Sequence, residues 1–215
     1  EQAKILFAEA EENNLDNKLD ERWDRWHTCS LCEQQYHGLV RCALGWACWK
    51  TYLGRPERDG SRLKAMNLLG NGLHDAEHYG DAMAVQEAEL AMARRLGTTE
   101  EYILNAQGNL AATYHMLRRF EEAIDMYRDV YHGFVKLNGE KDRDTLMVAE
   151  NYATSLVSLQ RFEEAKALLR KMMQVARRVL GESDSTTLRM RWNYAVALYR
   201  DCLLYTSDAA DELCR

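Results

Sequence analysis

The sequence predicts an all-α protein built as a solenoid of stacked helical hairpins. Three observations support this: a composition that favours helices, apolar residues at helical spacing, and an internal period of 42 residues. The 215 residues include one proline and 12 glycines, and they are rich in residues that lose little side-chain freedom in helices. No run of alternating β-branched residues indicates a strand.

The internal period is marked by residues that recur 42 positions apart. Gly97, Gly139 and Gly181 share this spacing, and the pentapeptides 119–123 and 161–165 are identical. Periods of this size indicate supersecondary units that stack because one unit cannot bury its apolar face alone. The array is predicted over residues 61–201, with units over 61–102, 103–144 and 145–186 and the first helix of a fourth unit over 187–201.

Each unit is predicted to be a hairpin of two helices. In the second unit the apolar pattern changes phase at Arg118–Arg119, which indicates the turn between them. Gly97, Gly139 and Gly181 are predicted to end the second helices, since glycine adopts the left-handed conformation without steric cost. Small residues are expected where two helix axes approach closely, namely Ala82, Ala111, Ala123, Ala153, Ala165 and Ala195.

A small residue and an aromatic in the first helix, followed by R-F-E-E-A at the second, resembles the tetratricopeptide repeat. The longer period, with Leu137-Asn-Gly-Glu140 and Val179-Leu-Gly-Glu182, is similar to the variety found in kinesin light chains. The resemblance implies a right-handed α-superhelix whose first helices line a concave groove for peptides or proteins. HEAT-type repeats are similar in length but do not predict the small and aromatic positions. The heptad region that joins a kinesin light chain to its heavy chain is absent from these residues, so association with a motor is not expected.

Polar residues of the first helices are the candidate contacts in this groove. Asn109, Asn151 and Asn193 are the clearest, because an amide can pair with the backbone of any extended ligand. The alternative is that these amides bond within the array. A clamp for a terminal carboxylate is rejected, because the face carries only two basic residues in distant units. The full candidate set is Lys64, Asn67, Asn71, Asn105, Asn109, His115, Asn151, Thr154, Arg189 and Asn193.

A cysteine-rich segment precedes the array. Cys29-x2-Cys32 is a spacing typical of structural zinc sites, and His37 and Cys42 complete a C-x2-C-x4-H-x4-C pattern that resembles a zinc knuckle. We therefore predict one structural zinc ion, with Cys48 as the alternative fourth ligand. If 38–54 is one helix, Cys42 and Cys48 lie on different faces, which favours the set with His37. Buried thiols and a redox pair remain the alternatives.

The two ends of the chain are predicted separately. Residues 1–26 are expected to form an N-terminal helical segment, and residues 27–60 a small zinc-binding module followed by a helix. Residues 202–215 break the helical pattern, and the DNA that would encode Cys202 to Glu212 is similar to a transposase adapter of sequencing libraries; the alternative is a short acidic tail. We therefore expect 202–215 to be non-native and the natural chain to continue past residue 201.

Composition narrows the function. The 28 basic and 34 acidic residues give a net charge of −6 without a basic stripe, so no nucleic acid partner is expected. No stretch approaches the roughly 20 apolar residues needed to cross a bilayer, so no membrane partner is expected. We expect a cytoplasmic protein whose partners are proteins or peptides.

Enzyme motifs are absent from the sequence. His74 and His78 lack the H-E-x-x-H order, and no Walker A motif or nucleophile elbow occurs. The predicted function is a non-catalytic scaffold or adaptor. The alternatives are a regulatory or substrate-recruiting arm of a larger enzyme, such as a zinc-module ubiquitin ligase, and a zinc-knuckle RNA binder. The RNA-binding alternative is weakened because Glu33 and Tyr36 replace the glycines of a zinc knuckle.

Overall fold

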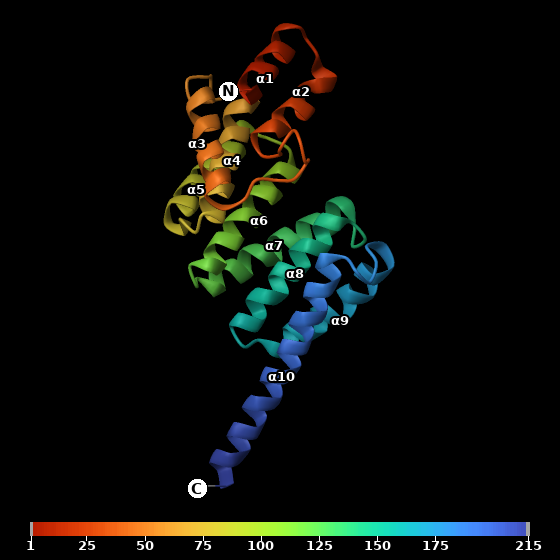
Figure 1. The fold of residues 1–215 in the computed structure, drawn as a ribbon. Coiled ribbons are helices and arrows are strands. Elements are labelled where there is room, and N and C mark those ends of the chain that lie inside the picture. The colour runs from red at the N-terminus through yellow and green to blue at the C-terminus, as the bar shows by residue number, and fades with distance from the viewer. Residues whose placement is uncertain (1, 214–215) are drawn as a thin grey trace. The chain divides into compact units, whose positions relative to one another are not determined.

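The computed structural model describes the backbone of residues 2–213 and the side chains of residues 2–203, and this part of the chain is all-α (Figure 1). The all-α fold predicted from the sequence is confirmed. One isolated antiparallel bridge, Thr28 with Gln35, is the only extended pairing within residues 2–213. The helices are α1 Gln2–Glu12, α2 Asp16–Trp23, the 3₁₀ helix η1 Asp24–Trp26, α3 Gly38–Tyr52, α4 Gly60–Asp75, α5 Tyr79–Leu96, α6 Glu100–Met116, α7 Phe120–Asn138, α8 Arg143–Ser158, α9 Phe162–Val179 and α10 Ser185–Leu213.

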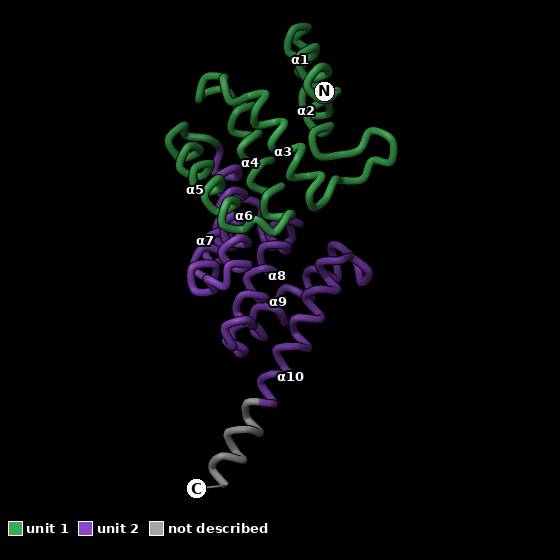
Figure 2. The backbone as a smooth tube through the Cα atoms, turned by 60° about the vertical axis from the view of Figure 1, so that its left-hand side comes forward, with its two compact units in different colours: residues 1–98 green, residues 99–215 purple. Residues whose placement is uncertain are grey.

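The chain divides into two compact units, unit 1 over Glu1–Thr98 and unit 2 over Thr99–Arg215 (Figure 2). This division differs from the sequence prediction, which separated residues 27–60 from the hairpin that follows. The reason is the close packing of α3 on α4. A Cβ at Gly72 would lie 2.8 Å from the Arg41 carbonyl oxygen, and one at Gly45 would lie 2.9 Å from the Leu69 Cα. The two helix backbones therefore touch, and no other residue fits at these positions.

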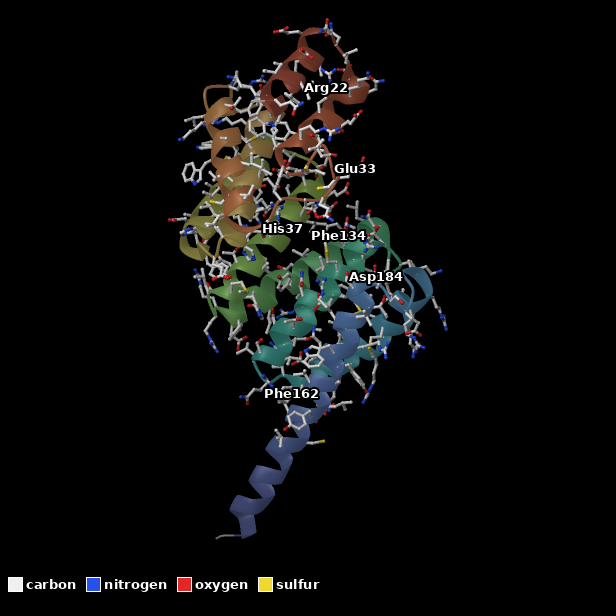
Figure 3. The ribbon with its side chains drawn as sticks, viewed as in Figure 1. Arg22, Glu33, His37, Phe134, Phe162 and Asp184 are labelled. Atoms are coloured by element: carbon white, nitrogen blue, oxygen red, sulfur yellow. The ribbon has the colours of Figure 1, made fainter. Side chains whose placement is uncertain are left out.

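Aromatic side chains fill the N-terminal part of unit 1. The rings of Phe7 and Trp23 meet edge to face at 5.1 Å, and Tyr52 of α3 lies 5.2 Å from Trp23. Arg22, labelled in Figure 3, donates to the Leu6 carbonyl at 2.6 Å and fastens α2 to α1. Such offset and edge contacts add to the free energy gained from burying the rings.

Unit 2 repeats one hairpin, with α6 and α7 forming the first and α8 and α9 the second (Figure 1). Ala111, Ala123, Ala153 and Ala165 are fully buried, as expected for residues at close helix contacts. Ala195 is exposed, which corrects the prediction that it is buried. In the described chain no second helix follows α10, so nothing packs against that residue.

A left-handed residue ends the first helix of each hairpin, although none of these residues is glycine. Glu77, Arg118 and Gln160 have φ values of 64°, 62° and 61°. In each case the next N–H bonds a carbonyl five residues back, such as Arg119 to Tyr114 at 2.9 Å. The shared R-F-E-E-A segment then forms an i, i+3 ion pair, Arg119 with Glu122 in one unit and Arg161 with Glu164 in the next. The turn is thus a repeated structural unit that the side-chain pattern alone does not reveal.

The second helices end close to glycines of positive φ, as predicted. Gly97 has φ 65°, and Gly139 and Gly181 have φ 85° and 94°. The backbone of α10 continues as a helix through the 201–202 boundary, where the sequence predicted a break. No helix in the described part is long and apolar enough to cross a membrane.

Candidate peptide-binding face

The first helices of unit 2, α6, α8 and α10, are joined in series by polar contacts. His115 Nδ1 of α6 lies 2.9 Å from Ser155 Oγ of α8. Asn193 of α10 donates to Glu150 of α8 at 3.0 Å. These bonds run from one first helix to the next, so the predicted polar residues of this unit share what we call the first-helix face. The face is made by Asn105, Asn109, His115, Met147, Asn151, Thr154, Arg189, Trp192 and Asn193.

Glu150 is a nearly buried carboxylate, 4% exposed, at the centre of this face. Arg189 Nε lies 3.0 Å from one of its oxygens, and Asn193 Nδ2 and Thr154 Oγ1 donate to the other at 3.0 and 3.2 Å. A buried carboxylate needs such donors, because the loss of hydration is otherwise uncompensated. Arg189, Asn193 and Thr154 therefore hold α10 on α8. For Asn193, the alternative of bonding within the array is the one observed.

Asn109 and Asn151 behave differently from Asn193. Neither side-chain amide has a hydrogen-bond partner among the residues whose side chains the structure describes, and both are partly exposed. Asn105, one turn before Asn109 on α6, is exposed. The amides therefore remain available to a ligand, and each offers one acceptor and two donor hydrogens.

In unit 1 the predicted groove residues bond within the protein. Lys64 pairs with Asp20 at 2.9 Å on the surface. Asn67 Nδ2 donates at 3.0 Å to Glu89 of α5, a residue that is 1% exposed, and Asn71 donates to Asn67 at 3.1 Å. Asn67 and Asn71 therefore bond within unit 1, whereas Lys64 is exposed and its surface ion pair contributes little to stability.

His74 and His115 pack against the aromatic residue that opens the second helix. His74 meets Tyr79 at 5.3 Å and His115 meets Phe120 at 5.1 Å, in both cases edge to face. Burial lowers the pKa of both imidazoles below the ordinary value. His74 is half-buried, whereas His78, four residues later, is exposed.

The Cys29–Cys32 segment forms the tip of a small hairpin. Tyr36 donates its N–H to the His27 carbonyl at 2.8 Å, and Glu33 donates to the Cys29 carbonyl at 3.0 Å with a φ of 57°. Hydrogen bonds from the Cys32 and Leu31 N–H groups and from the Cys32 thiol lower the pKa of the Cys29 thiol to about 7. The turn thus places the two sulfurs close together, as the C-x2-C spacing predicts.

The other predicted zinc ligands lie elsewhere. Cys42 is buried in a cluster with Leu69, Leu73 and Ala82, and burial raises the pKa of its thiol. His37, which opens α3 and is labelled in Figure 3, is exposed and lies 4.0 Å from Asp75. Among the described residues, no three His, Cys, Asp or Glu side chains are grouped to hold a metal ion.

The zinc site expected from Cys29, Cys32, His37 and Cys42 is therefore not assembled in the structure. The alternative ligand Cys48 is fully buried beside Trp23, Trp26 and Tyr52, and burial raises the pKa of its thiol strongly. The physical reason is the helix that starts at Gly38, because it commits Cys42 and Cys48 to the apolar core. The residues present fit a two-thiol turn and do not fit a closed four-ligand site.

Two buried acids, Glu89 and Glu150, were not predicted from the sequence. They determine which asparagine amides are hydrogen-bonded within the protein. Their signal was weak: each acid occupies a buried position within an otherwise apolar helical face. Charged residues are so rarely buried without partners that this position alone indicates a polar contact.

The tetratricopeptide repeat family model matches residues 103–144 and 145–186. These residues are tetratricopeptide repeats. The recognition made from the sequence is thereby confirmed for two of the units. Repeats of this kind form protein-interaction scaffolds and are typically non-catalytic. No curated protein matches the sequence.

Solved structures with tetratricopeptide-like repeats share the fold. BtubC (BKLC) from P. vanneervenii is 17% identical, with a TM-score of 0.61, and the match covers 75% of this chain and 65% of that one. A Podosopora anserina protein described as a kinesin light chain with nearly identical TPR-like repeats is 15% identical, with a TM-score of 0.62 and coverage of 98% and 90%. Rap protein complexed with Competence and Sporulation Factor is 14% identical, with a TM-score of 0.57 and coverage of 81% and 53%. The kinesin-light-chain-like architecture predicted from the sequence is confirmed as a fold.

Proposed function

We propose that this protein is a non-catalytic scaffold whose first-helix face in unit 2 binds an extended peptide segment of a partner protein. The observation that carries the proposal is the pair of open amides, Asn109 on α6 and Asn151 on α8. Both occupy the same position in consecutive repeats. A ligand that lies across the two helices meets the same donor and acceptor pattern twice, and its backbone satisfies both amides regardless of sequence.

Apolar side chains on the same face supply the second part of the binding energy. Trp192 of α10 is 71% exposed and Met147 of α8 is 41% exposed. Large exposed aromatic residues are uncommon on surfaces that contact only water and are enriched where partners bind. We therefore expect the ligand to place an apolar side chain near Trp192 while its backbone crosses the amides.

A solved structure of similar fold contains a bound ligand, which is consistent with the proposal. Rap protein, which shares the architecture, has been solved as a complex with Competence and Sporulation Factor. This supports ligand binding by a repeat array of this kind, and the chemistry of the ligand must come from the residues of this chain.

The test begins by selecting binders of the full chain from a random peptide display library and measuring their affinity by fluorescence anisotropy. Replacing both Asn109 and Asn151 with Ala removes two amide contacts, so we expect affinity to fall by a factor of about 10 or more. Asn138→Ala, on an exposed position of α7, is the matched control and should leave affinity unchanged. Selected peptides that bind the double variant as tightly as the parent would refute the proposal.

A further inference from the structure

Unit 2 contains a second surface, an open cavity of about 460 Å³ between α9 and α10. It lies on a different side of α10 from the contacts that Arg189 and Asn193 make with Glu150. Its volume falls in the range of pockets that hold small ligands or single side chains. Its lining is basic, in a chain of net charge −6, and consists of Arg170, Met173, Gln174, Arg177, Arg191 and Tyr194.

Helical spacing explains why these residues converge. Arg170 and Arg177 are seven positions apart on α9, so they lie on the same face with Met173 between them. Arg191 and Tyr194 are three apart on α10 and face them across the cavity. The cluster is dispersed in the sequence, which is why no basic stripe is visible there.

One carboxylate serves two of the three guanidinium groups. Glu182, in the loop before α10, accepts from Arg177 Nε at 2.6 Å and lies 3.5 Å from Arg191. Arg170 instead donates to the Tyr194 hydroxyl at 2.8 Å. The Glu182 pairs are more than half exposed, and exposed ion pairs contribute little to stability. A more highly charged anion can therefore displace Glu182 at small cost.

We propose that this cavity binds a phosphorylated side chain of a peptide partner. Guanidinium groups present parallel N–H donors that match phosphate oxygens, and three of them balance a dianion better than they balance one carboxylate. Met173 offers an apolar contact to the residues flanking the phosphate. The inference rests on the proposed function, because it makes the phosphate an additional contact for a peptide ligand of unit 2.

The test compares two degenerate fluorescent peptide libraries, one with phosphoserine at a fixed position and one with serine there, against the full chain. We expect the phosphorylated library to bind about tenfold more tightly. Arg177→Gln and Arg191→Gln should each remove this advantage. Arg177→Lys should remove part of it, because the charge remains but the paired donors are lost. Glu182→Gln should increase the affinity of the phosphorylated library, since the competing carboxylate is gone.

Arg128→Gln on α7 is the matched control, because Arg128 is a surface arginine paired with a nearby acid, as Arg177 is. It should leave the difference between the libraries unchanged. Equal binding of the two libraries, or an equal loss in the Arg128 variant, overturns the inference. Displacement of the phosphorylated library by inorganic phosphate at matching concentration overturns the assignment to a peptide. The inference and the proposed function fail separately, since the Asn109 and Asn151 double variant changes the binding of both libraries, whereas the arginine variants change only one.

Discussion

Asn67 of unit 1 is used in the opposite way from Asn109 and Asn151 of unit 2, although all three lie on the first helix of a helical hairpin. In unit 1, Asn67 is bonded to the buried Glu89 of the next helix. In unit 2, the amides of Asn109 and Asn151 have no hydrogen-bond partner among the described side chains, and both residues are partly exposed. The four asparagines 67, 109, 151 and 193 are spaced by 42 residues, whereas the second-helix alanines Ala82 and Ala123 are 41 apart.

The position of the left-handed turn residue in each hairpin shows why Asn67 differs from Asn109 and Asn151. Asn109 and Asn151 lie nine residues before the turn residues Arg118 and Gln160, whereas Asn67 lies ten residues before Glu77. A shift of one residue rotates a side chain by about 100° around a helix. Asn67 is thereby turned toward α5. In unit 2 the residue ten positions before the turn residue Arg118 is Gly108, which lies beside Val130. Equal spacing in sequence therefore does not ensure an equal role, because the turn residues Glu77 and Arg118 are 41 residues apart, whereas Arg118 and Gln160 are 42 apart.

The largest expected difference between the units concerns the backbone contact of α3 with α4. Gly72→Ala places a methyl group 2.8 to 2.9 Å from the backbone of Arg41 and Cys42, which must separate two helices. We expect the free energy of unfolding of unit 1 to fall by about 3 kcal/mol. Hydrogen exchange followed by mass spectrometry reports each unit separately.

Gly108→Ala in α6 is the matched control for this change. Its Cβ would meet only Val130 at 3.8 Å, so the better helix propensity of alanine should stabilise unit 2 by about 0.5 kcal/mol. If the two substitutions had similar effects, close packing would not distinguish the units.

The next largest effect on stability distinguishes Asn67, which is bonded within the protein, from Asn109, which is not. Asn67→Ala removes a donor to the buried Glu89 carboxylate, and we expect a loss of about 2 kcal/mol from the stability of unit 1. Asn109→Ala should change the stability of unit 2 by less than about 0.5 kcal/mol. Urea denaturation of the single variants measures both. An equally large loss at Asn109 would mean that this amide also has a structural partner.

Acid should weaken unit 1 more than unit 2. Burial lowers the pKa of His27 and His74 in unit 1, and of His115 in unit 2, below the ordinary value of about 6.5. The unfolded chain therefore takes up these protons at a higher pH than the folded chain, so stability is complete above pH ~6.5 and is lost below it. Hydrogen exchange at neutral pH and near pH 5 should show the larger loss in unit 1. The difference should shrink when His27 and His74 are replaced with Gln.

The smallest stability effect is expected at the hairpin cysteines. Cys29→Ser and Cys32→Ser change side chains on a surface turn, so the melting temperature should remain nearly unchanged. Cys48→Ser, which places a hydroxyl in the aromatic cluster, should lower it clearly. A fall in melting temperature on adding a chelator, lost in the Cys29 variant, would show instead that the zinc site predicted from the sequence forms.

The fold could be predicted from the sequence because the residues that repeat every 42 positions are the ones that pack and end the helices. The buried alanines and the terminal glycines were each predicted by residue type, and the structure contains them where helices touch or end. Ala195 was the exception, since its burial requires a neighbouring helix that its own sequence cannot reveal.

The site was predicted only in part, because long-range partners decide it. Asn193 and Arg189 were chosen as ligand contacts, and Glu150, which binds both, is some 40 positions away in sequence. The arginine cavity was missed for the same reason, since its residues meet only when α9 packs on α10. The four predicted zinc ligands lie apart in the structure because Cys42 is on the buried face of α3, which the spacing of the motif does not show.

A peptide ligand of unit 2 is expected to contact the amides of Asn109 and Asn151. The most direct test is to record the side-chain amide NMR signals of the isotope-labelled full chain while adding a peptide selected from the display library. We expect the signals of Asn109 and Asn151 to shift, while those of Asn67 and Asn193, which are bonded internally, stay in place. Saturable binding that leaves the Asn109 and Asn151 signals unmoved would contradict it.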